Sequence, residues 1–267
     1  MVDIRKPVWL TSKKLGGKKT RDITKYLRQY KLHTVCESAK CPNRGECFDR
    51  GTATFMILGE TCTRNCTFCA IDKGKNNLFA PDPDEPSAIA KLAKKLGLNH
   101  VVVTTVTRDD LNDGGASQFM KVIWEIRKKC DKEVSIEVLI SDFKGDLKQV
   151  ERIVQTAPDI LNHNIETIKR LYPSVRPMAD FKRSLQVLQK ARETDKDILT
   201  KSGFMVGLGE KKEEVISLMK ELRDVDVDIL TIGQYIAPSR NHYQVKEYIH
   251  PDVFSYYKNE GELLGFK

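Results

Sequence analysis

The chain has 267 residues, of which 40% are hydrophobic, and its 45 Lys and Arg against 37 Asp and Glu give a formal net charge of +8. Because α/β barrels reach about 250 residues as one unit, this length fits one large domain or two small ones. No run approaches the roughly 18 apolar residues of a membrane span, and the N-terminus lacks the apolar core of a secretory signal. The sequence therefore excludes a membrane protein, a disordered chain and a small secreted protein. It predicts a cytoplasmic location, or an organellar matrix in a eukaryote.

Positive charge and cysteine are concentrated near the N-terminus. Residues 1–51 hold 13 Lys and Arg against five Asp and Glu, so the whole excess charge lies there, and six of the seven cysteines lie from Cys36 to Cys69. In a reducing compartment we do not expect these cysteines to form disulfides. We interpret residues 1–50 as an irregular, basic extension, residues 51–250 as the catalytic body and residues 251–267 as a C-terminal helix.

The body alternates predicted strands with predicted helices. Strands are expected over residues 52–58, 101–106, 134–140, 160–164, 198–206 and 229–235. Helices are expected over residues 87–96, 117–129, 147–155, 165–172, 181–194, 211–225 and 251–264. Sequential βα units imply parallel strands with right-handed crossovers. The predicted fold class is therefore α/β, a partial (β/α)6 TIM-like barrel with a cysteine-bearing extension, and its site is expected at the C-terminal ends of the strands.

Three cysteines follow the first strand of the body. Cys62, Cys66 and Cys69 are spaced C-x3-C-x2-C on the loop that begins at Gly59. Three thiolates on one short loop suit an iron–sulfur cluster and leave one iron open to a substrate or cofactor. A structural zinc site needs four ligands, and no fourth is nearby. Zinc or buried free thiols remain the alternative at this point.

A second triplet precedes the barrel. Cys36, Cys41 and Cys47 are spaced C-x4-C-x5-C, so they too supply three ligands. Cys130 ends a predicted helix and is interpreted as a spare thiol. His100 and His242 are expected to make ordinary hydrogen bonds rather than to bind metal.

These motifs carry a family resemblance. The C-x3-C-x2-C loop, with Phe68 before its last cysteine, resembles that of the radical S-adenosylmethionine (SAM) superfamily. The segments CESAKCPNRGECF and GTATFMILGETCTRNCTFCAI closely resemble the lipoyl synthase family, and so do TTVTRDDLNDGGA, ILNHNIET, LYPSVRP, KSGFMVGLGE and PSRNHYQV. The match extends over residues 7–266.

The resemblance implies an activity and its cofactors. Lipoyl synthases insert two sulfur atoms into an octanoyl chain on a lysine of a lipoyl carrier protein. The family pattern puts a 4Fe–4S cluster that cleaves SAM to a 5′-deoxyadenosyl radical on Cys62, Cys66 and Cys69, and an auxiliary 4Fe–4S cluster that donates sulfur on Cys36, Cys41 and Cys47. The implied partners are an octanoylated lipoyl domain or H-protein, a reductase or ferredoxin-type electron donor and an iron–sulfur carrier for cluster repair. Neither nucleic acid nor a membrane is expected.

Further site residues are proposed from their positions near the strand ends, and Glu137 on the third strand and Lys201 on the fifth are expected to be inward-facing polar groups. The candidate cofactor-binding residues are Phe68, Thr107, Glu137, Asn164, Lys201, Gly207 and Glu210. The last two belong to residues 203–210, which resemble a G-x-I-x-G-x-x-E pattern that the superfamily places against adenine. Arg176 is interpreted as either a site residue or part of a surface turn.

One feature of the family has no match here. The family's R-S-S-Y motif, whose serine closes the auxiliary cluster, is missing, so the fourth ligand of that cluster is not assigned and we expect that the chain is truncated. We further expect this form to cleave SAM but to make little finished product.

The basic extension allows several interpretations, which are a nucleic-acid arm, a solvated surface or a docking site for an acidic carrier domain. Docking would make carrier binding sensitive to salt and to Lys→Glu changes at Lys13, Lys14, Lys18 and Lys19. Two alternative functions stay open from the residues, which are another radical SAM sulfur-inserting enzyme and a zinc-binding nucleic-acid adaptor.

Overall fold

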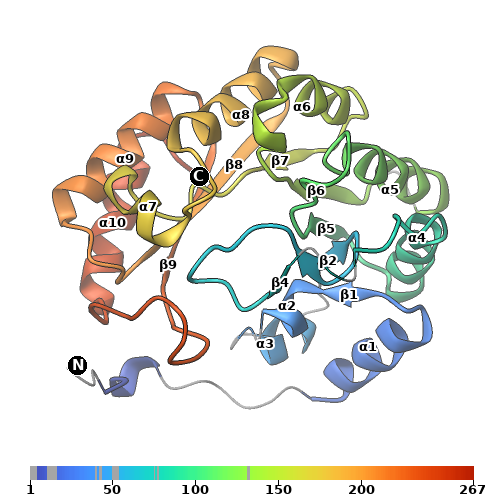
Figure 1. The fold of residues 1–267 in the computed structure, drawn as a ribbon, viewed down its shortest axis with the longest axis horizontal. Coiled ribbons are helices and arrows are strands. Elements are labelled where there is room, and N and C mark those ends of the chain that lie inside the picture. Colours follow the sequence, from blue (N-terminus) through green and yellow to red (C-terminus); the bar gives the residue numbers. More distant parts are fainter. Residues whose placement is uncertain are drawn as a thin grey trace.

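A curved parallel sheet with helices on its outer side forms the body of the protein (Figure 1). The computed structural model describes residues 5–10, 17–39, 41, 44–49, 54–74, 76, 78–130 and 133–267, without the side chains of Lys18, Lys19 and Asp49. The strand order is β1-β2-β5-β6-β7-β8-β9. The strands are β1 (His33–Thr34), β2 (Thr54–Ile57), β5 (His100–Thr105), β6 (Ser135–Leu139), β7 (Ile160–Asn162), β8 (Leu199–Val206) and β9 (Ile229–Gln234).

All neighbouring strands from β2 to β9 run parallel, and only β1 is antiparallel to its neighbour. Within the described part of the chain no ladder joins β9 to β1, so the barrel is open between these two edges. The six strands predicted for the body are β2, β5, β6, β7, β8 and β9, and the predicted partial barrel is confirmed. A small parallel pair, β3 (Thr61–Cys62) and β4 (Asp72–Lys73), lies apart from the main sheet.

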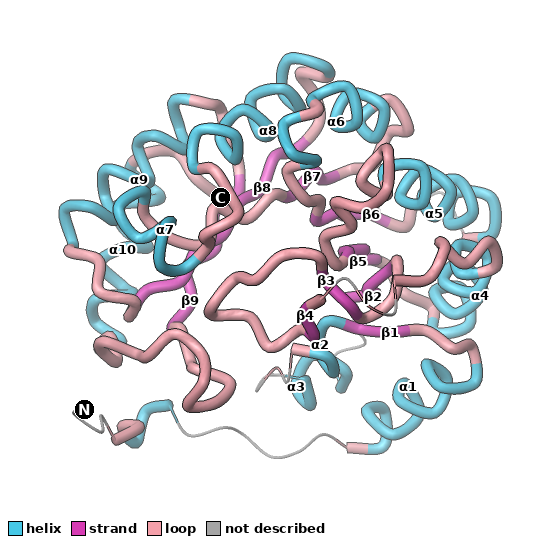
Figure 2. Tube along the Cα trace, in the orientation of Figure 1, coloured by secondary structure: helices cyan, strands magenta, loops and turns pink. Residues whose placement is uncertain are grey.

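Helices follow the strands and cover the outside of the sheet (Figure 2). The helices of the body are α4 (Glu85–Leu96), α5 (Ala116–Lys129), α6 (Leu147–Val154), α7 (Tyr172–Val175), α8 (Phe181–Thr194), α9 (Lys212–Asp224) and α10 (Pro251–Leu263), with short 3-10 turns η2 (Phe143–Gly145) and η3 (Lys169–Leu171). The N-terminal part contains η1 (Val8–Leu10), α1 (Lys18–Gln29), α2 (Val35–Ser38) and α3 (Arg44–Asp49).

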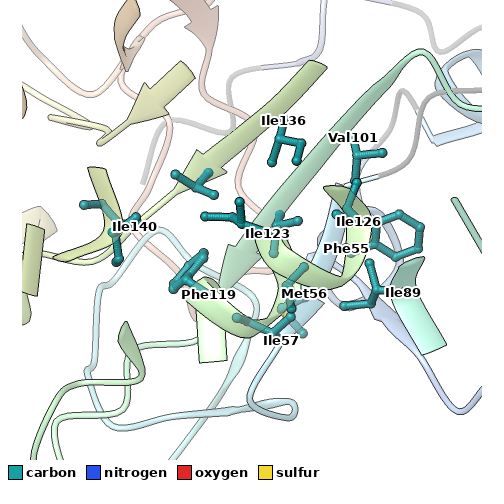
Figure 3. Packing of buried hydrophobic residues seen from close by; sticks show 14 of the residues in the cluster. Phe55, Met56, Ile57, Ile89, Val101, Phe119, Ile123, Ile126, Ile136 and Ile140 are labelled. Carbon is teal, nitrogen blue, oxygen red and sulfur yellow. The ribbon is translucent and has the colours of Figure 1, made fainter. Parts of the chain in front are cut away.

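The core lies between the sheet and its helices because strand side chains alternate between two faces. Val101 and Val103 of β5 are fully buried, whereas Val102 between them is only half-buried. Figure 3 shows Val101 near Ile126, which α5 contributes to the same apolar cluster together with Phe119 and Ile123. The helix-facing row of the sheet is therefore packed tightly, and the opposite row faces the interior of the open barrel.

The prediction that the N-terminal extension is irregular is wrong for part of its length. The extension is not irregular over residues 17–39, because α1 buries Ile23 and Leu27 in the same cluster as Phe55 of β2. These two apolar residues, four apart, form a narrow helical stripe among charged neighbours. The division of the chain at residue 50 stays a prediction.

The predicted helix over residues 165–172 is shorter than expected. Helical turns begin only at Lys169, because Glu166 has a positive φ of 66° and bridges to Phe204 of β8. Among the residues that the structure describes, no helix is long and apolar enough to cross a membrane.

Candidate functional site

The first cysteine triplet lies on a closed loop at the C-terminal end of β2. Cys62 belongs to β3, which pairs with β4, and the N–H of Gly74 donates to the carbonyl of Cys62 at 3.0 Å. Inside this loop the Nζ of Lys73 donates to the carbonyl of Cys66 at 2.8 Å, and the N–H of Cys69 donates to the same carbonyl at 3.3 Å. Figure 2 shows the loop between β3 and β4 across the middle of the barrel.

The barrel holds one side of this loop through the segment after β5. The N–H and Oγ1 of Thr63 both donate to the carbonyl of Thr107 at 2.9 Å. The guanidinium of Arg64 donates to both carboxylate oxygens of Asp109, at 2.8 and 3.0 Å, and to Oδ1 of Asp142 at 2.5 Å. Because the side chains of Arg64 and Asp142 are 4% and 0% exposed, this ion pair is shielded from solvent. Two carboxylates thus fix the residue between the first two cysteines.

The other side of the loop is held by the segment around α7. The N–H of Thr67 donates to the carbonyl of Val175 at 3.0 Å, and its Oγ1 donates to the carbonyl of Ser174 at 2.8 Å. The carbonyl of Thr67 accepts from the N–H of Tyr243 at 2.9 Å. The cysteine loop is therefore anchored on both sides of the barrel opening.

The sulfur atoms of this triplet fit a shared cluster. Burial raises the pKa of the Cys69 thiol to about 11 and also raises the pKa of Cys66, and the charges of the other cysteines of the triplet contribute to both rises. Thiols that influence one another in this way lie close together. The N–H of Arg64 donates to Sγ of Cys62 at 3.5 Å, and the backbone N–H of Ile71 donates to the sulfur of Cys69. Backbone N–H donors to sulfur and three thiols on one anchored loop suit iron–sulfur ligation.

The second triplet is arranged on α2, α3 and the connection between them. Thr34 caps α2 by accepting from the N–H of Glu37 at 3.3 Å, and the N–H of Cys41 donates to the carbonyl of Cys36 at 3.1 Å. Burial raises the pKa of the Cys36 thiol, and the charges of Cys41 and Cys47 raise it further. These three thiols therefore influence one another electrostatically, which is compatible with their being ligands of one cluster.

The two cysteine segments are directly linked. Glu60, two residues before Cys62, accepts from Oγ of Ser38 at 3.3 Å and contacts Nδ1 of His33 at 3.1 Å. Among the described residues, no three His, Cys, Asp or Glu side chains are placed to hold a single metal ion. A 4Fe–4S cluster places its thiolates on different irons, so it needs no such single point.

A buried polar group beside the first triplet was not identified from the sequence. Burial raises the pKa of Glu166, although the charge of Arg176 and a bond from the side chain of Asn164 oppose the rise. The charges of Glu166 and Arg176 act in turn on Cys66, so both lie near that thiol. The acidic residue of the ILNHNIET motif, at the C-terminal end of β7, is the signal that could have found it.

Arg176 is a buried residue of this site, not part of a surface turn. Its side chain donates to the carbonyls of Asn164 and Ile165 at 3.1 and 3.2 Å, and to the hydroxyl of Tyr172 at 3.1 Å. Its Nε is buried and has no partner among the described residues. One donor of this buried cation is therefore available to a ligand.

Glu137 and Lys201 meet each other in the barrel interior. The Nζ of Lys201 lies 2.9 Å from both carboxylate oxygens of Glu137, which also accepts from Asn162 at 2.8 Å and contacts His100 at 3.4 Å. Burial alone would raise the pKa of Glu137, but His100, Lys201 and Asn162 together lower it to about 2. Both candidates face inward as predicted and already neutralise one another, while their predicted contact with a cofactor stays a prediction.

Gly207 and Glu210 build the turn after β8. The carboxylate of Glu210 accepts from the N–H of Gly207 at 2.5 Å and from that of Leu208 at 2.9 Å. Gly207 has a φ of 95°, and a Cβ there would lie 2.5 Å from the carbonyl oxygen of Glu247. Glycine is required by this close approach, and any role of the turn in binding adenine stays a prediction.

The remaining candidates keep ordinary contacts. Phe68 is half-buried and packs against the apolar cluster of β8 and α9. Nδ1 of His242 lies 2.8 Å from Oγ of Ser239, and the thiol of Cys130 lies 3.6 Å from the carbonyl of Ala90. Lys13 and Lys14 lie outside the described residues.

Comparisons with known proteins agree on one family. The model of the Radical SAM superfamily matches residues 56–222. A lipoyl synthase of Caldanaerobacter subterraneus is 53% identical over 99% of this chain and 91% of the relative, and one of Caldicellulosiruptor bescii is 52% identical over 99% and 90%. Among solved structures, methylornithine synthase matches with a TM-score of 0.63 at 14% identity, covering 80% of this chain and 63% of that one. A maturase of the FeFe-hydrogenase matches with a TM-score of 0.64 at 14% identity, covering 79% and 49%. At such low identity these two structures show a shared fold alone.

Proposed function

The chain belongs to the lipoyl synthase family of radical SAM enzymes, and we propose that Cys62, Cys66 and Cys69 hold the 4Fe–4S cluster at which SAM is cleaved. The reaction inserts two sulfur atoms into an octanoyl chain on a lipoyl carrier protein, with two 4Fe–4S clusters and SAM as cofactors. The convergence of three half-buried thiols on a loop anchored at both sides supports this assignment. Three ligands leave one iron for SAM.

Cys36, Cys41 and Cys47 are assigned to the auxiliary cluster, which supplies the sulfur. Their mutual electrostatic influence and the N–H of Thr54, which bonds the thiol of Cys36, support the assignment. The bridge from Glu60 to His33 and Ser38 holds the two cysteine segments in a fixed relation. A fixed relation matters because sulfur has to reach a carbon radical before that radical reacts elsewhere.

Arg176 is assigned to the carboxylate of SAM. Its unpartnered Nε offers a charge-assisted hydrogen bond beside Cys66. Asn164 and Glu166 are assigned to polar groups of the same ligand, because they share this corner of the barrel with Arg176. The adjacent His163 is kept neutral, since burial and the charge of Arg176 together lower its pKa to about 4.

The inner face of the sheet offers an apolar wall to the acyl chain. Val102, Leu139 and Met205 lie on the row that faces away from the helices, and each is half-buried rather than fully covered. An apolar wall excludes water from a reactive carbon centre, and the acid and base on the same inner row, Glu137 and Lys201, are paired with each other. No general base is needed, because the C–H bonds that are replaced are not acidic.

The partners beyond the carrier protein follow from the chemistry. A one-electron donor has to reduce the SAM cluster, and an iron–sulfur carrier has to rebuild a cluster that gives up sulfur. The relatives named above are bacterial, which supports a cytoplasmic reaction. The division of the chain into a cluster-bearing extension, a barrel and a C-terminal helix is retained as a proposal.

The presence of two cysteine triplets beside one open barrel, the first on a loop anchored at both sides, supports this proposal, and a single experiment tests it. Protein prepared without oxygen should hold about eight iron atoms per chain, as two 4Fe–4S clusters require. With SAM, a reductant and an octanoyl-lysine peptide, mass spectrometry should detect 5′-deoxyadenosine and a peptide that has gained sulfur. Four irons per chain would contradict the auxiliary site, and the absence of both products would contradict the activity.

A further inference from the structure

The outer face of α1 presents a row of positive charge. Arg21, Lys25 and Arg28 are all exposed, whereas Ile23 and Leu27 on the opposite side of the helix are buried. Spacings of four and three residues place the three cations on one helical face. No described carboxylate forms an ion pair with any of them, so their charge is directed to solvent.

A second row on α4 extends this surface. Lys91, Lys94 and Lys95 are exposed on the helix next to α1 in Figure 1. The Nζ of Lys95 lies 4.2 Å from the ring centroid of Tyr26 and 5.9 Å from that of Tyr30, which joins the two helices. We call these six cations of α1 and α4 the basic face.

The basic face lies beside the auxiliary cysteines and the open edge of the barrel. Oγ1 of Thr20 on α1 donates to the carbonyl of Gly45 on α3, the helix that carries Cys47. The chain after α1 leads through Lys31 to β1, the edge strand of the sheet. Lys31 also lines a cleft of about 280 Å³ together with Phe79, a residue that is 77% exposed. Protein interfaces are enriched in aromatic residues and have a polar, solvent-accessible rim, which Phe79 and the neighbouring cations could supply.

We propose that the basic face docks an acidic surface of the protein domain that carries the octanoyl-lysine arm. The inference rests on the proposed function, because only that function requires a whole folded domain to deliver its lysine to this enzyme. A rim of unpaired cations attracts an acidic partner over a distance and orients it as it approaches. Docking here would place the arm next to the sulfur-donating triplet, at the side where the barrel is open.

The test compares two substrates of the same chemistry. The holoenzyme is assayed with an octanoylated lipoyl domain and with a short octanoyl-lysine peptide that lacks the domain surface. In the variant Arg21→Glu, Lys25→Glu, Arg28→Glu, kcat/KM for the domain should fall about tenfold, because three modest attractions become repulsions. For the peptide, kcat/KM should stay within about twofold, because these three exposed side chains point to solvent and the peptide lacks the domain surface that they would attract.

The matched control reverses three cations elsewhere on the barrel. Lys182, Lys212 and Lys220 are exposed on α8 and α9, and their change to Glu should leave both substrates unaffected. The wild-type enzyme gives an independent measure that involves no substitution. Raising potassium chloride from about 50 to about 300 mM should lower kcat/KM for the domain several-fold more than for the peptide, because salt screens exposed charge.

Three results would overturn the docking proposal. They are an unchanged kcat/KM for the domain in the α1 variant, an equal loss on both substrates, and an equal loss in the control variant. Tight RNA binding that the α1 variant loses, with carrier turnover unchanged, would assign the face to nucleic acid instead. Absence of product from the peptide with wild-type enzyme would refute the proposed function itself, so the two failures are distinguishable.

Discussion

The ion pair between Arg64 and Asp142 makes a quantitative prediction about the first cysteine loop. Changing Asp142→Asn keeps the size of the side chain but removes a charge that is 0% exposed and 2.5 Å from Arg64. Burial alone would raise the pKa of Asp142, yet Arg64 lowers it from 3.8 to about 2, which corresponds to about 2.5 kcal/mol of folding free energy. Breaking a buried pair costs about 3–5 kcal/mol, and Asp109 still holds Arg64. We therefore expect a loss of about 3 kcal/mol.

Thermal unfolding of the holoenzyme at pH 7 measures this loss. For a chain of this size about 3 kcal/mol lowers Tm by roughly 6–10 °C. The control is Glu262→Gln, which breaks a solvent-exposed pair with Lys258 and should change Tm by no more than about 2 °C. The rate of SAM cleavage should also fall in the Asp142→Asn protein, because the loop that carries Cys62 and Cys66 loses one of its anchors.

The pH dependence of the same pair has a definite sign. A carboxyl whose pKa is lower in the folded state stabilises the protein above its ordinary pKa, and this stabilisation is lost as the pH falls through the folded value. The wild-type advantage over Asp142→Asn should thus be complete at pH 6 and shrink from about pH 4 to about pH 2. A Tm difference no larger than that of the Glu262→Gln control, or one that does not shrink with acid, would refute this reasoning.

Four further substitutions and one double change separate the roles assigned above. The Cys41→Ser protein should still cleave SAM but give no sulfur-containing product, whereas the Cys66→Ser protein should do neither. Chromatography of 5′-deoxyadenosine measures the cleavage, and mass spectrometry of the peptide measures the sulfur. Retained sulfur insertion in either variant would contradict the assignment. Gly207→Ala should destabilise the protein by about 1–3 kcal/mol, because its Cβ would meet the carbonyl oxygen of Glu247 at 2.5 Å; an unchanged Tm would contradict the packing argument. Glu137→Gln leaves the partly buried Lys201 without its counter-charge and should lower the free energy of unfolding in urea by about 3 kcal/mol. The double change with Lys201→Met should recover part of that loss. No recovery would contradict the pairing.

The sequence predicts the barrel well because its strands are short apolar runs between clear turns. Val101–Val103 is one such run, and it becomes β5 at nearly the predicted position. The N-terminal helix α1 is harder to foresee, since only Ile23 and Leu27 mark its buried side within a run of charges. Its burial depends on an apolar cluster that it shares with Phe55 of β2, which is distant in the sequence.

The candidate site could likewise be predicted where its residues are close in the sequence, and not where they meet only in the folded chain. The cysteines are recognisable because their spacing is local. By contrast, the influence of the Arg176 charge on the pKa of Cys66 depends on the return of the chain at α7, which no spacing reveals. Likewise, Glu137 and Lys201 are 64 residues apart, so the sequence indicates that each faces inward but not that they neutralise each other.

The origin of the inserted sulfur tests the central claim most directly. The enzyme is reconstituted with iron and isotopically heavy sulfide, then allowed one turnover with SAM, a reductant and an octanoyl-lysine peptide. If Cys36, Cys41 and Cys47 hold the sulfur donor, the lipoyl peptide should carry heavy sulfur, and the same preparation of Cys41→Ser should yield none. A product that contains only light sulfur, or heavy product from the Cys41→Ser protein, would contradict the account.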